Sequence, residues 1–451
     1  MELRKYQIEL SQQAAELLRS KKIAYLAMEV RTGKTFTALN AAALYRAKKV
    51  LFLTTKNGIK SIQEDYDKLN PDFEIVIINN ESIHKITDND FDLIISDEHH
   101  RCSAYSKPNK VTKIMKQRFG SLPMIFLSGT PAIESVSQWF HSFYVSDHSP
   151  FKNCKNFYEW FKIMGCVHTE FQTGGAWKTP NYSNSADVVK KYYSLDYRLI
   201  SKNDPEYDVK RKLLDKKLND ALNRQKVAEL KILSFVEPYL LKYTQADAGF
   251  TSTVNQKVLY FEMQSQTNEM LKHLLRDRIL EGKTETVLGD AASKLMSKVH
   301  QISNGTVIFE SGKSAILDKS KAEFIRRHFS DQKIAVFYFF QKELELLKEV
   351  FGDNLTTDLE TFNTSDKNIA LQQVAGSEAI SLKAADSLVY YSFGYSGKNF
   401  VQGIARMATI DRKEQNVYFV MQKDDINSRI YQTVKTKQRY SEKLFLKEYK
   451  L

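Results

Sequence analysis

The stretch "YLAMEVRTGKTFTA", residues 25–38, decides the predicted fold. An apolar run at 23–28 leads through Gly33, Lys34 and Thr35 into the helical segment "KTFTALNAAALYRA". A strand, a Gly-Lys-Thr turn and a helix in this order are typical of a phosphate-binding loop, in which backbone N–H groups at a helix N-terminus hold phosphate. The usual pattern G-x-x-x-x-G-K-[ST] has glycine where this chain has Met28. The assignment therefore depends on the motifs that surround the stretch.

Apolar runs of strand character recur on both sides of a central region. They lie at 23–28, 49–55, 74–80, 91–96 and 123–129, and again at 257–263, 333–340, 367–374, 386–393 and 416–422. Amphipathic helical segments separate them, and this alternation predicts parallel sheets with helices on both faces. The sequence between these two series of apolar runs has a helical pattern and is rich in aromatic and charged residues. We therefore expect an α/β protein with domains at 1–140, 141–250 and 251–451.

Composition narrows the class of protein. The chain has 451 residues, more than one domain usually holds, and 42% of them are hydrophobic. Its formal net charge of +12 favours a polyanionic partner, either nucleic acid or an anionic membrane. The three cysteines lack CxxC spacing, so neither a disulfide framework nor a structural zinc site is indicated. The N-terminal text has no apolar signal region and no window is apolar enough to span a bilayer, so a cytosolic protein is expected.

Two further motifs follow predicted strands. Asp97 and Glu98 come directly after the run at 91–96, where an open α/β sheet places its ligand crevice. Phosphoryl transfer to water needs a metal ligand and a group that positions the attacking water, and these two carboxylates suit those tasks. Ser128 and Thr130, in "FLSGTP", are available to relay contacts from the acidic pair to the next domain. Each motif alone is compatible with a helix cap or a turn, but together they predict a nucleoside triphosphatase.

In order, the motifs resemble helicase superfamily two and, within it, the Swi/Snf-type DNA translocases, with bacteriophage DEAD/DEAH-like helicases closest in character. "MEVRTGKT" is similar to the family's "DEMGLGKT", "DEHHR" to "DEAHR" and "LSGTP" to "LTGTP". "LRKYQ" resembles the start of the family's core, "FYEWF" a signature of its first helical insertion, and "VEPYLLKYTQAD" the lead into its second lobe. "KNFVQGIAR" resembles the sixth motif. The resemblance spans nearly the whole chain.

The resemblance implies two RecA-like lobes in tandem with a helical insertion between them, and ATP with Mg²⁺ as cofactors. It implies catalytic roles for Lys34, Glu98 and Arg406, the last as an arginine finger. It also implies that Gln7 recognises adenine and that Thr35 and Asp97 bind Mg²⁺. The implied phosphate-binding residues are Arg31, Thr32, Gly33, Lys34 and Thr35, and the coupling residues are Ser128, Thr130, Gln402 and Arg412.

The chain departs from the family's pattern at several positions. Arg31 stands at the middle glycine of the phosphate loop and must hold that backbone without glycine's freedom at positive φ. In the sixth motif Arg406 fits the first arginine, but Thr409 occupies the second position, and Arg412 is available to replace it. In the fifth motif Ala379 and Ser381 replace a glycine and an asparagine, which leaves open how that loop senses DNA and ATP together.

The expected function is ATP-driven translocation on DNA, with duplex or branched DNA favoured over RNA, in phage recombination, replication or repair. No membrane contact is expected. Phage or host replication and recombination proteins are candidate partners. The expected location is the host cytoplasm, in association with the nucleoid. An RNA-dependent helicase, a nucleic-acid clamp with little turnover and a restriction-enzyme motor remain alternatives. Basic and aromatic residues of the middle region either track a DNA backbone or form a solvated helix face: Lys190, Lys191, Tyr192, Tyr193, Arg198 and 210–217.

Overall fold

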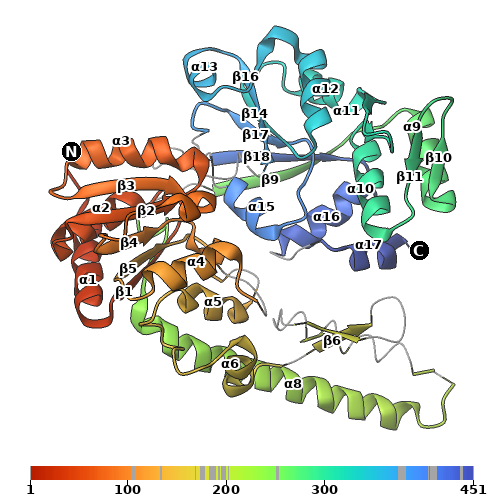
Figure 1. Cartoon of the computed structure of the whole chain (residues 1–451). Helices are drawn as coiled ribbons and strands as arrows, with labels where there is room; N and C mark the ends of the chain where they lie inside the picture. The colour runs from red at the N-terminus through yellow and green to blue at the C-terminus, as the bar shows by residue number, and fades with distance from the viewer. Residues whose placement is uncertain are drawn as a thin grey trace. The chain divides into compact units, whose positions relative to one another are not determined.

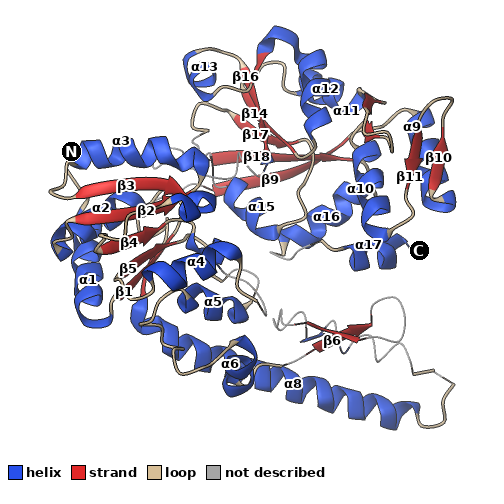
Figure 2. Cartoon of the chain, viewed as in Figure 1, coloured by secondary structure: helices blue, strands red, loops and turns tan. Residues whose placement is uncertain are grey.

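The structure is a computed structural model of the chain. It describes residues 2–102, 107–132, 135–167, 169–172, 178–181, 189–190, 193, 200–201, 203–249, 253–373, 382–404, 406, 414–436 and 440–449. The chain divides into two compact units, Met1–Ala248 and Gly249–Leu451. Each unit has its own central sheet, flanked by helices (Figures 1 and 2).

The first unit is built on a six-stranded sheet in the order β3-β2-β4-β5-β1-β8, with every pair parallel. Its strands are β1 (Ile23–Met28), β2 (Lys49–Thr54), β3 (Glu74–Asn79), β4 (Leu93–Ser96), β5 (Met124–Leu127) and β8 (Leu240–Tyr243). Its sheet-flanking helices are α1 (Lys5–Lys21), α2 (Lys34–Tyr45), α3 (Ile59–Leu69) and α4 (Lys110–Phe119), with 3₁₀ turns η1 (Lys56–Gly58), η2 (Asn80–Lys85) and η3 (His99–Cys102).

Successive residues of the central strands enter two different cores. Ile23 and Tyr25 of β1 pack in a core with α4 and the helices that follow, whereas Ala24 and Leu26 pack in a core with α1, α2 and α3. Strands buried on both faces have near-continuous apolar sequences, because successive side chains point to opposite sides of a sheet. This explains why the strand sequences of the first unit contain so few polar residues.

The segment that follows β5 is mainly helical. It contains η4 (Val136–Gln138), α5 (Trp139–Tyr144), α6 (Phe157–Met164), the antiparallel pair β6 (Thr169–Gln172) and β7 (Lys178–Asn181), the 30-residue helix α8 (Tyr207–Val236) and η5 (Glu237–Tyr239). Aromatic side chains of α5 and α6 pack with Ile232 and Val236 of α8. The segment then returns to the sheet as β8, which pairs with β1 although the sequence indicated no strand there.

The second unit has a six-stranded parallel sheet in the order β15-β16-β14-β17-β18-β9. Its strands are β9 (Thr253–Tyr260), β14 (Ile334–Tyr338), β15 (Leu355–Thr356), β16 (Asn368–Gln372), β17 (Ser387–Tyr390) and β18 (Glu414–Met421). Two hairpins pair β10 (Ile279–Glu281) with β11 (Thr286–Leu288), and β12 (Thr306–Ile308) with β13 (Ser314–Ile316). The helices are α9 (Ser265–Asp277), α10 (Ala292–Ser303), α11 (Ser320–His328), α12 (Gln341–Phe351), α13 (Leu359–Thr364), α15 (Gly397–Ile404), α16 (Ile426–Lys435) and α17 (Glu442–Tyr449), with the turn η6 (Gly352–Asn354).

The predicted fold class, α/β with two parallel-sheet lobes in tandem, is confirmed. All ten predicted strands belong to the two large sheets. Strands β8 and β15 were not predicted, and both are four residues long or shorter. Among the described residues, no helix combines the length and the apolar character that a membrane span requires.

Candidate functional site

The predicted phosphate-binding loop, called the phosphate loop below, occupies residues 29–33, between the end of β1 and the start of α2. Gly33 has a φ of 78° and Arg31 a φ of 65°, so both lie in the left-handed region. This conformation costs a non-glycine residue about 1–2 kcal/mol. A Cβ atom at Gly33 would overlap Nε2 of Gln7, so a side chain there would require Gln7 to move away from the loop. The loop therefore adopts glycine-like backbone at two positions, although only one of them is glycine.

Lys34 is the first residue of α2, with Thr35 beside it, and both are half-buried. The carbonyl oxygen of Glu29 accepts hydrogen bonds from Lys34 Nζ at 3.3 Å and from Thr32 Oγ1 at 2.7 Å. The first turn of α2, which the structure describes in full, contains no acidic residue. The positive end of its helix dipole is thus not neutralised from within the helix. An ammonium group folded over such an N-terminus suits a bound phosphate.

The start of α1 lies against this loop. Gln7 is 5% exposed, and its Nε2 donates to the carbonyl oxygen of Gly33 at 3.4 Å while its Oε1 accepts from Arg4 N at 2.9 Å. The hydroxyl of Tyr6 donates to the carbonyl oxygen of Thr32 at 3.0 Å. The structure thus brings Gln7 to the phosphate loop, and its role in recognising adenine stays a prediction.

Asp97 follows β4 in the middle of the sheet. Its Oδ2 accepts a hydrogen bond from Thr54 Oγ1 at the end of β2, at 2.9 Å, and its N–H donates to Leu53 O at 2.8 Å. Burial and the neighbouring Glu98 carboxylate raise the pKa of Asp97 to about 6, and the Lys34 ammonium acts in the opposite direction. The lysine of the phosphate loop and the carboxylate after β4 are therefore close enough for their charges to interact.

A short polar chain connects Glu98 to the loop after β5. Glu98 is buried, has a φ of 46°, and places Oε2 3.1 Å from His100 Nδ1. The same Nδ1 lies 2.9 Å from Ser128 Oγ, which accepts a hydrogen bond from Thr130 N at 3.1 Å. Ser128 and the backbone of Thr130 are thus linked to Glu98 through His100, which was not singled out from the sequence, and the coupling role of Ser128 and Thr130 stays a prediction.

The loop after β5 also lies against the phosphate loop. A Cβ atom on Gly129 would stand 3.4 Å from the carbonyl oxygen of Met28 and 3.5 Å from the backbone nitrogen of Val30. The strand order β4-β5-β1 explains this contact, because the carboxyl ends of neighbouring parallel strands meet at one edge of the sheet. Three motifs far apart in the sequence therefore meet at one edge.

His99 fixes the acidic pair to α5, a role that was not predicted. Its ring stacks on Phe126 at a centroid distance of 3.7 Å. Its Nε2 lies 2.7 Å from Ser142 O and its Nδ1 2.9 Å from Ser96 Oγ. Burial lowers the pKa of His99 to about 4, so the ring is neutral at pH 7, with Nε2–H donating to the carbonyl and Nδ1 accepting from the hydroxyl. The sequence signal that could have pointed to His99 is its position, because it stands where the family's "DEAHR" has alanine.

The residues of this edge fit a magnesium ion carried by a nucleotide. No group of three or more His, Cys, Asp or Glu suited to a metal occurs in the described part of the chain. Magnesium usually takes one or two protein oxygens together with phosphates and water, and Thr35 and Asp97 supply such oxygens. A cation here would offset the repulsion between Asp97 and Glu98 that raises the pKa of Asp97. The hydroxyl oxygens of Thr55 and Thr130 are buried and make no hydrogen bond within the described residues.

In the second unit, Arg406 is 6% exposed and its carbonyl oxygen accepts from Leu382 N at 3.1 Å. Burial raises the pKa of Tyr390, and the Arg406 guanidinium acts in the opposite direction, which places the two side chains near one another. Gln402 belongs to α15, of which the structure describes the backbone at this position. The other positions of this unit that the sequence analysis singled out lie outside the described residues: Ala379, Ser381, Thr409 and Arg412.

The basic residues proposed to track DNA fall partly on α8. The segment 210–217 belongs to this helix, whose sequence has eight Lys or Arg against four Asp or Glu. Lys210 is already paired with Asp204 at 2.7 Å and with Glu206 at 3.3 Å. Lys190 is exposed and Tyr193 is half-buried. The other three lie outside the described residues: Lys191, Tyr192 and Arg198.

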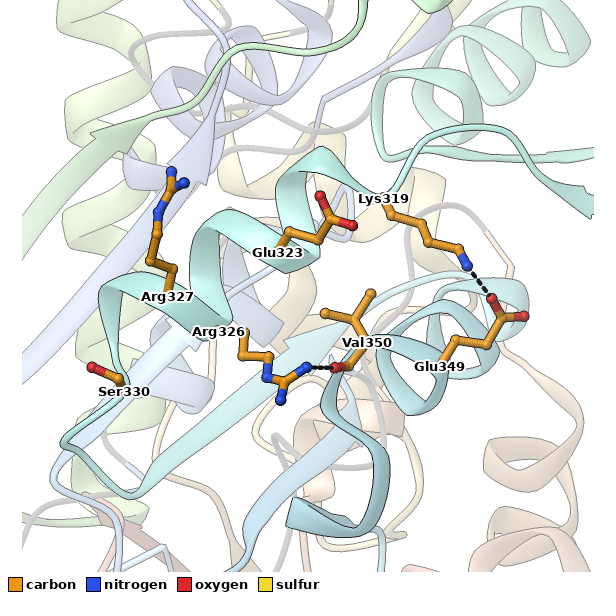
Figure 3. Close-up of a pocket in the computed structure, with 7 residues that line it drawn as sticks. All are labelled: Lys319, Glu323, Arg326, Arg327, Ser330, Glu349 and Val350. Atoms are coloured by element: carbon orange, nitrogen blue, oxygen red, sulfur yellow. Dashed lines mark hydrogen bonds and ion pairs between the residues drawn. The ribbon is translucent and has the colours of Figure 1, made fainter.

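A separate pocket of about 500 Å³ lies on α11 and α12 of the second unit (Figure 3). Lys319 pairs with Glu349 at 2.7 Å, and Arg326 donates to the carbonyl oxygen of Val350 at 2.6 Å. Its lining therefore has mixed and partly compensated charge, unlike the edge that carries Lys34 and Asp97. The pocket is lined by Lys319, Glu323, Arg326, Arg327, Ser330, Glu349 and Val350.

Comparisons with known proteins find one matching family and similar solved structures. Residues 1–84 match the family described as "Type III restriction enzyme, res subunit", and no curated protein matches the chain. Two solved structures from Sulfolobus solfataricus are similar to the chain, each at 14% sequence identity. The SWI2/SNF2 ATPase core in complex with dsDNA matches over 96% of this chain and 91% of that chain, with a TM-score of 0.39. The SWI2/SNF2 ATPase core domain matches over 97% of this chain and 89% of that chain, with a TM-score of 0.38. The matched residues 1–84 include α1, the phosphate loop and strands β1 to β3, so they contain both Gln7 and Lys34.

Proposed function

We propose that the chain is a nucleic-acid-dependent ATPase of helicase superfamily two that translocates on DNA. The observation that carries the proposal is the meeting of Lys34, Thr35 and Asp97 at the carboxyl edge of the first sheet, where Lys34 and Asp97 interact through their charges. A lysine at a helix N-terminus facing a carboxylate across the sheet edge is the arrangement that binds a nucleoside triphosphate with its metal ion. The match of residues 1–84 agrees with this class.

Each residue of the edge has a proposed task. Lys34 and the backbone N–H groups around Gly33 bind the phosphates, and Thr35 and Asp97 hold the metal. When bound, magnesium would neutralise negative charge on the phosphates. Glu98 orients the attacking water, because it is held in place by His100 beside the metal ligand Asp97. The chain formed by His100, Ser128 and Thr130 transmits changes at Glu98 to the loop after β5.

Two further assignments rest on the motif resemblance. Gln7 recognises adenine from its place against the phosphate loop. Arg406 is the arginine finger, with Gln402 and Arg412 as coupling residues of the second unit. Gln402 and Arg406 lie within the sixth-motif sequence "KNFVQGIAR", and Arg412 lies six residues after its last residue. We further propose ATP and Mg²⁺ as the cofactors.

DNA is the proposed track. The net charge of +12 favours a polyanion, and α8 offers an excess of basic residues along 30 positions. The ordered Swi/Snf-type motifs favour duplex or branched DNA over RNA, and a bacteriophage recombination, replication or repair role. A restriction-type motor is a second candidate because of the family that residues 1–84 match. That candidate predicts DNA cleavage when a nuclease partner is supplied, whereas translocation alone leaves the duplex intact.

The direct test is ATP hydrolysis by the full chain with and without duplex DNA, in the wild type and in Lys34→Ala. We expect DNA-stimulated hydrolysis in the wild type and a loss of at least about a hundredfold in the variant, because Lys34 places a positive charge at the N-terminus of α2, where the phosphates are proposed to bind. Lys60→Ala, at an exposed position of α3, is the matched control and should hydrolyse ATP normally. Near-normal hydrolysis by Lys34→Ala would remove the assignment of the phosphate loop.

A further inference from the structure

We propose that Gln245 is a positioning residue of the phosphate loop, which it braces from the segment that follows β8. The inference rests on the proposed function, because it assumes that residues 29–33 bind phosphate. Gln245 lies within "VEPYLLKYTQAD", but the sequence indicated no site role for it, and it lies more than two hundred residues from the loop.

The pairing of β8 with β1 brings this segment to the loop. Met28, the last residue of β1, is in register with Tyr243, the last residue of β8. The ladder continues one step further, because Glu29 N donates to Tyr243 O at 2.9 Å. The chain that leaves β8 therefore runs beside the first residues of the phosphate loop.

Gln245 then makes two hydrogen bonds to consecutive residues of the loop. Its backbone N–H donates to Glu29 Oε2 at 2.7 Å, and its side-chain Nε2 donates to the carbonyl oxygen of Val30 at 2.9 Å. The next residue, Arg31, has a φ of 65°. A loop that holds a non-glycine residue in this conformation needs contacts that stabilise it. The two bonds from Gln245 lie directly before the strained position.

The segment that carries Gln245 is itself well held. Asp247 Oδ2 accepts from the N–H and the hydroxyl of Thr244, at 2.8 and 2.7 Å, which closes a tight turn around Gln245. The ring of Tyr243 stacks on Tyr6 at 4.3 Å, and Tyr6 in turn donates to Thr32 O. The loop is thus bonded to this turn near residues 29 and 30 and, through Tyr6, at residue 32.

The side-chain bond of Gln245 acts on the shape of the loop and touches no reacting atom. Removal of its Nε2 donor therefore weakens nucleotide binding, because the loop must be ordered when phosphate binds. Loss of one hydrogen bond predicts an affinity about five- to tenfold lower. Turnover at saturating ATP stays within about twofold, because Lys34, Asp97 and Glu98 keep their own contacts.

The test uses the full chain with Gln245→Met, which keeps the length of the side chain and removes the donor. The matched control is Gln63→Met on α3, where the glutamine Nε2 also makes one hydrogen bond, to Asp67 at 2.8 Å on the exposed surface. Calorimetric titration with Mg²⁺ and ADP measures affinity, steady-state hydrolysis separates KM from kcat, and amide hydrogen exchange without nucleotide reports the order of residues 29–34. Thermal unfolding checks that both variants fold.

We expect Gln245→Met to raise Kd and KM about five- to tenfold and to speed exchange over residues 29–34, with kcat retained and an unfolding midpoint within about 2 °C of the wild type. Equal Kd, KM and exchange in Gln245→Met and Gln63→Met would overturn the proposal. Lys34→Ala in the same titration separates the two claims. If it abolishes binding while Gln245→Met behaves as the control, the brace is wrong and the nucleotide site stands; if it binds normally, the proposed function is wrong.

Discussion

Replacing Asp97 with asparagine should stabilise the protein in the absence of nucleotide and abolish the magnesium-dependent part of its stabilisation by nucleotide. The cause is the environment of the carboxylate. Burial and the adjacent Glu98 raise the pKa of Asp97 from 3.8 to about 6. The folded state therefore binds a proton more tightly than the unfolded state does, so stability falls as pH rises from about 4 to 6. Above pH 6 the folded chain holds an ionised carboxylate that its surroundings disfavour.

The size of the gain follows from the shift. A change of about two pKa units corresponds to about 3 kcal/mol at most. Because Asp97 is half-buried rather than fully enclosed, solvent screening reduces this to about 1–2 kcal/mol. Asparagine keeps an oxygen that can accept the hydrogen bond from Thr54, so that contact is not lost. The gain should be present at pH 7.5 and absent below about pH 4.

The assay is chemical unfolding of the full chain at several pH values, with and without Mg²⁺ and ADP. Asp65→Asn is the matched control, because burial on α3 also raises the pKa of Asp65 to about 6 and its neighbours are Lys68 and Glu64 rather than the site. Both variants should gain stability at pH 7.5. Asp65→Asn should keep the stabilisation by magnesium nucleotide, about 2.7 kcal/mol at a ligand concentration of 100 times Kd, and Asp97→Asn should lose its magnesium-dependent part.

Two results would refute this reasoning. If Asp97→Asn is less stable than the wild type at pH 7.5, the carboxylate is not held in a disfavoured state by burial and by Glu98. If Asp97→Asn keeps full stabilisation by magnesium nucleotide, Asp97 does not hold the metal.

Two further predictions concern the chemistry of the site. Glu98→Gln should bind ATP with normal affinity and hydrolyse it at least about a hundredfold more slowly, since the amide cannot accept the proton of the attacking water; nucleotide binding and single-turnover hydrolysis measure this, and rapid hydrolysis would contradict the role. Arg406→Ala should lose about a thousandfold in kcat, more than Arg412→Ala; a larger loss in Arg412→Ala, measured by steady-state hydrolysis, would reverse the assignment of the arginine finger.

The sequence predicted most of the fold because the central strands are buried on both faces. Runs such as Ile23–Met28 are apolar without alternation and are separated by helical text, so their type and order follow from the sequence pattern. Strand β8 was missed for a physical reason. Its four residues have little strand signal of their own, and their conformation is set by pairing with β1, more than two hundred positions away.

The same distinction applies to the site. Lys34, Asp97 and Glu98 could be named because each directly follows a recognisable strand or opens a helix. A positive φ at Arg31 could be predicted because Arg31 stands at the middle glycine of the family's phosphate loop, and the structure has this positive φ. The contacts of His99 with Ser142 and of Gln245 with Val30 could not be predicted, because they join distant segments through the register of the folded chain.

The central claim, a motor whose ATP hydrolysis responds to DNA, is tested most directly by ATP hydrolysis of the full chain across nucleic-acid forms at one fixed salt concentration. The forms are duplex DNA, a four-way DNA junction, single-stranded DNA and duplex RNA, with Lys34→Ala as the zero reference. We predict strong stimulation by duplex or junction DNA and little by RNA. Equal hydrolysis with and without every DNA form, or stimulation by RNA alone, would contradict the account.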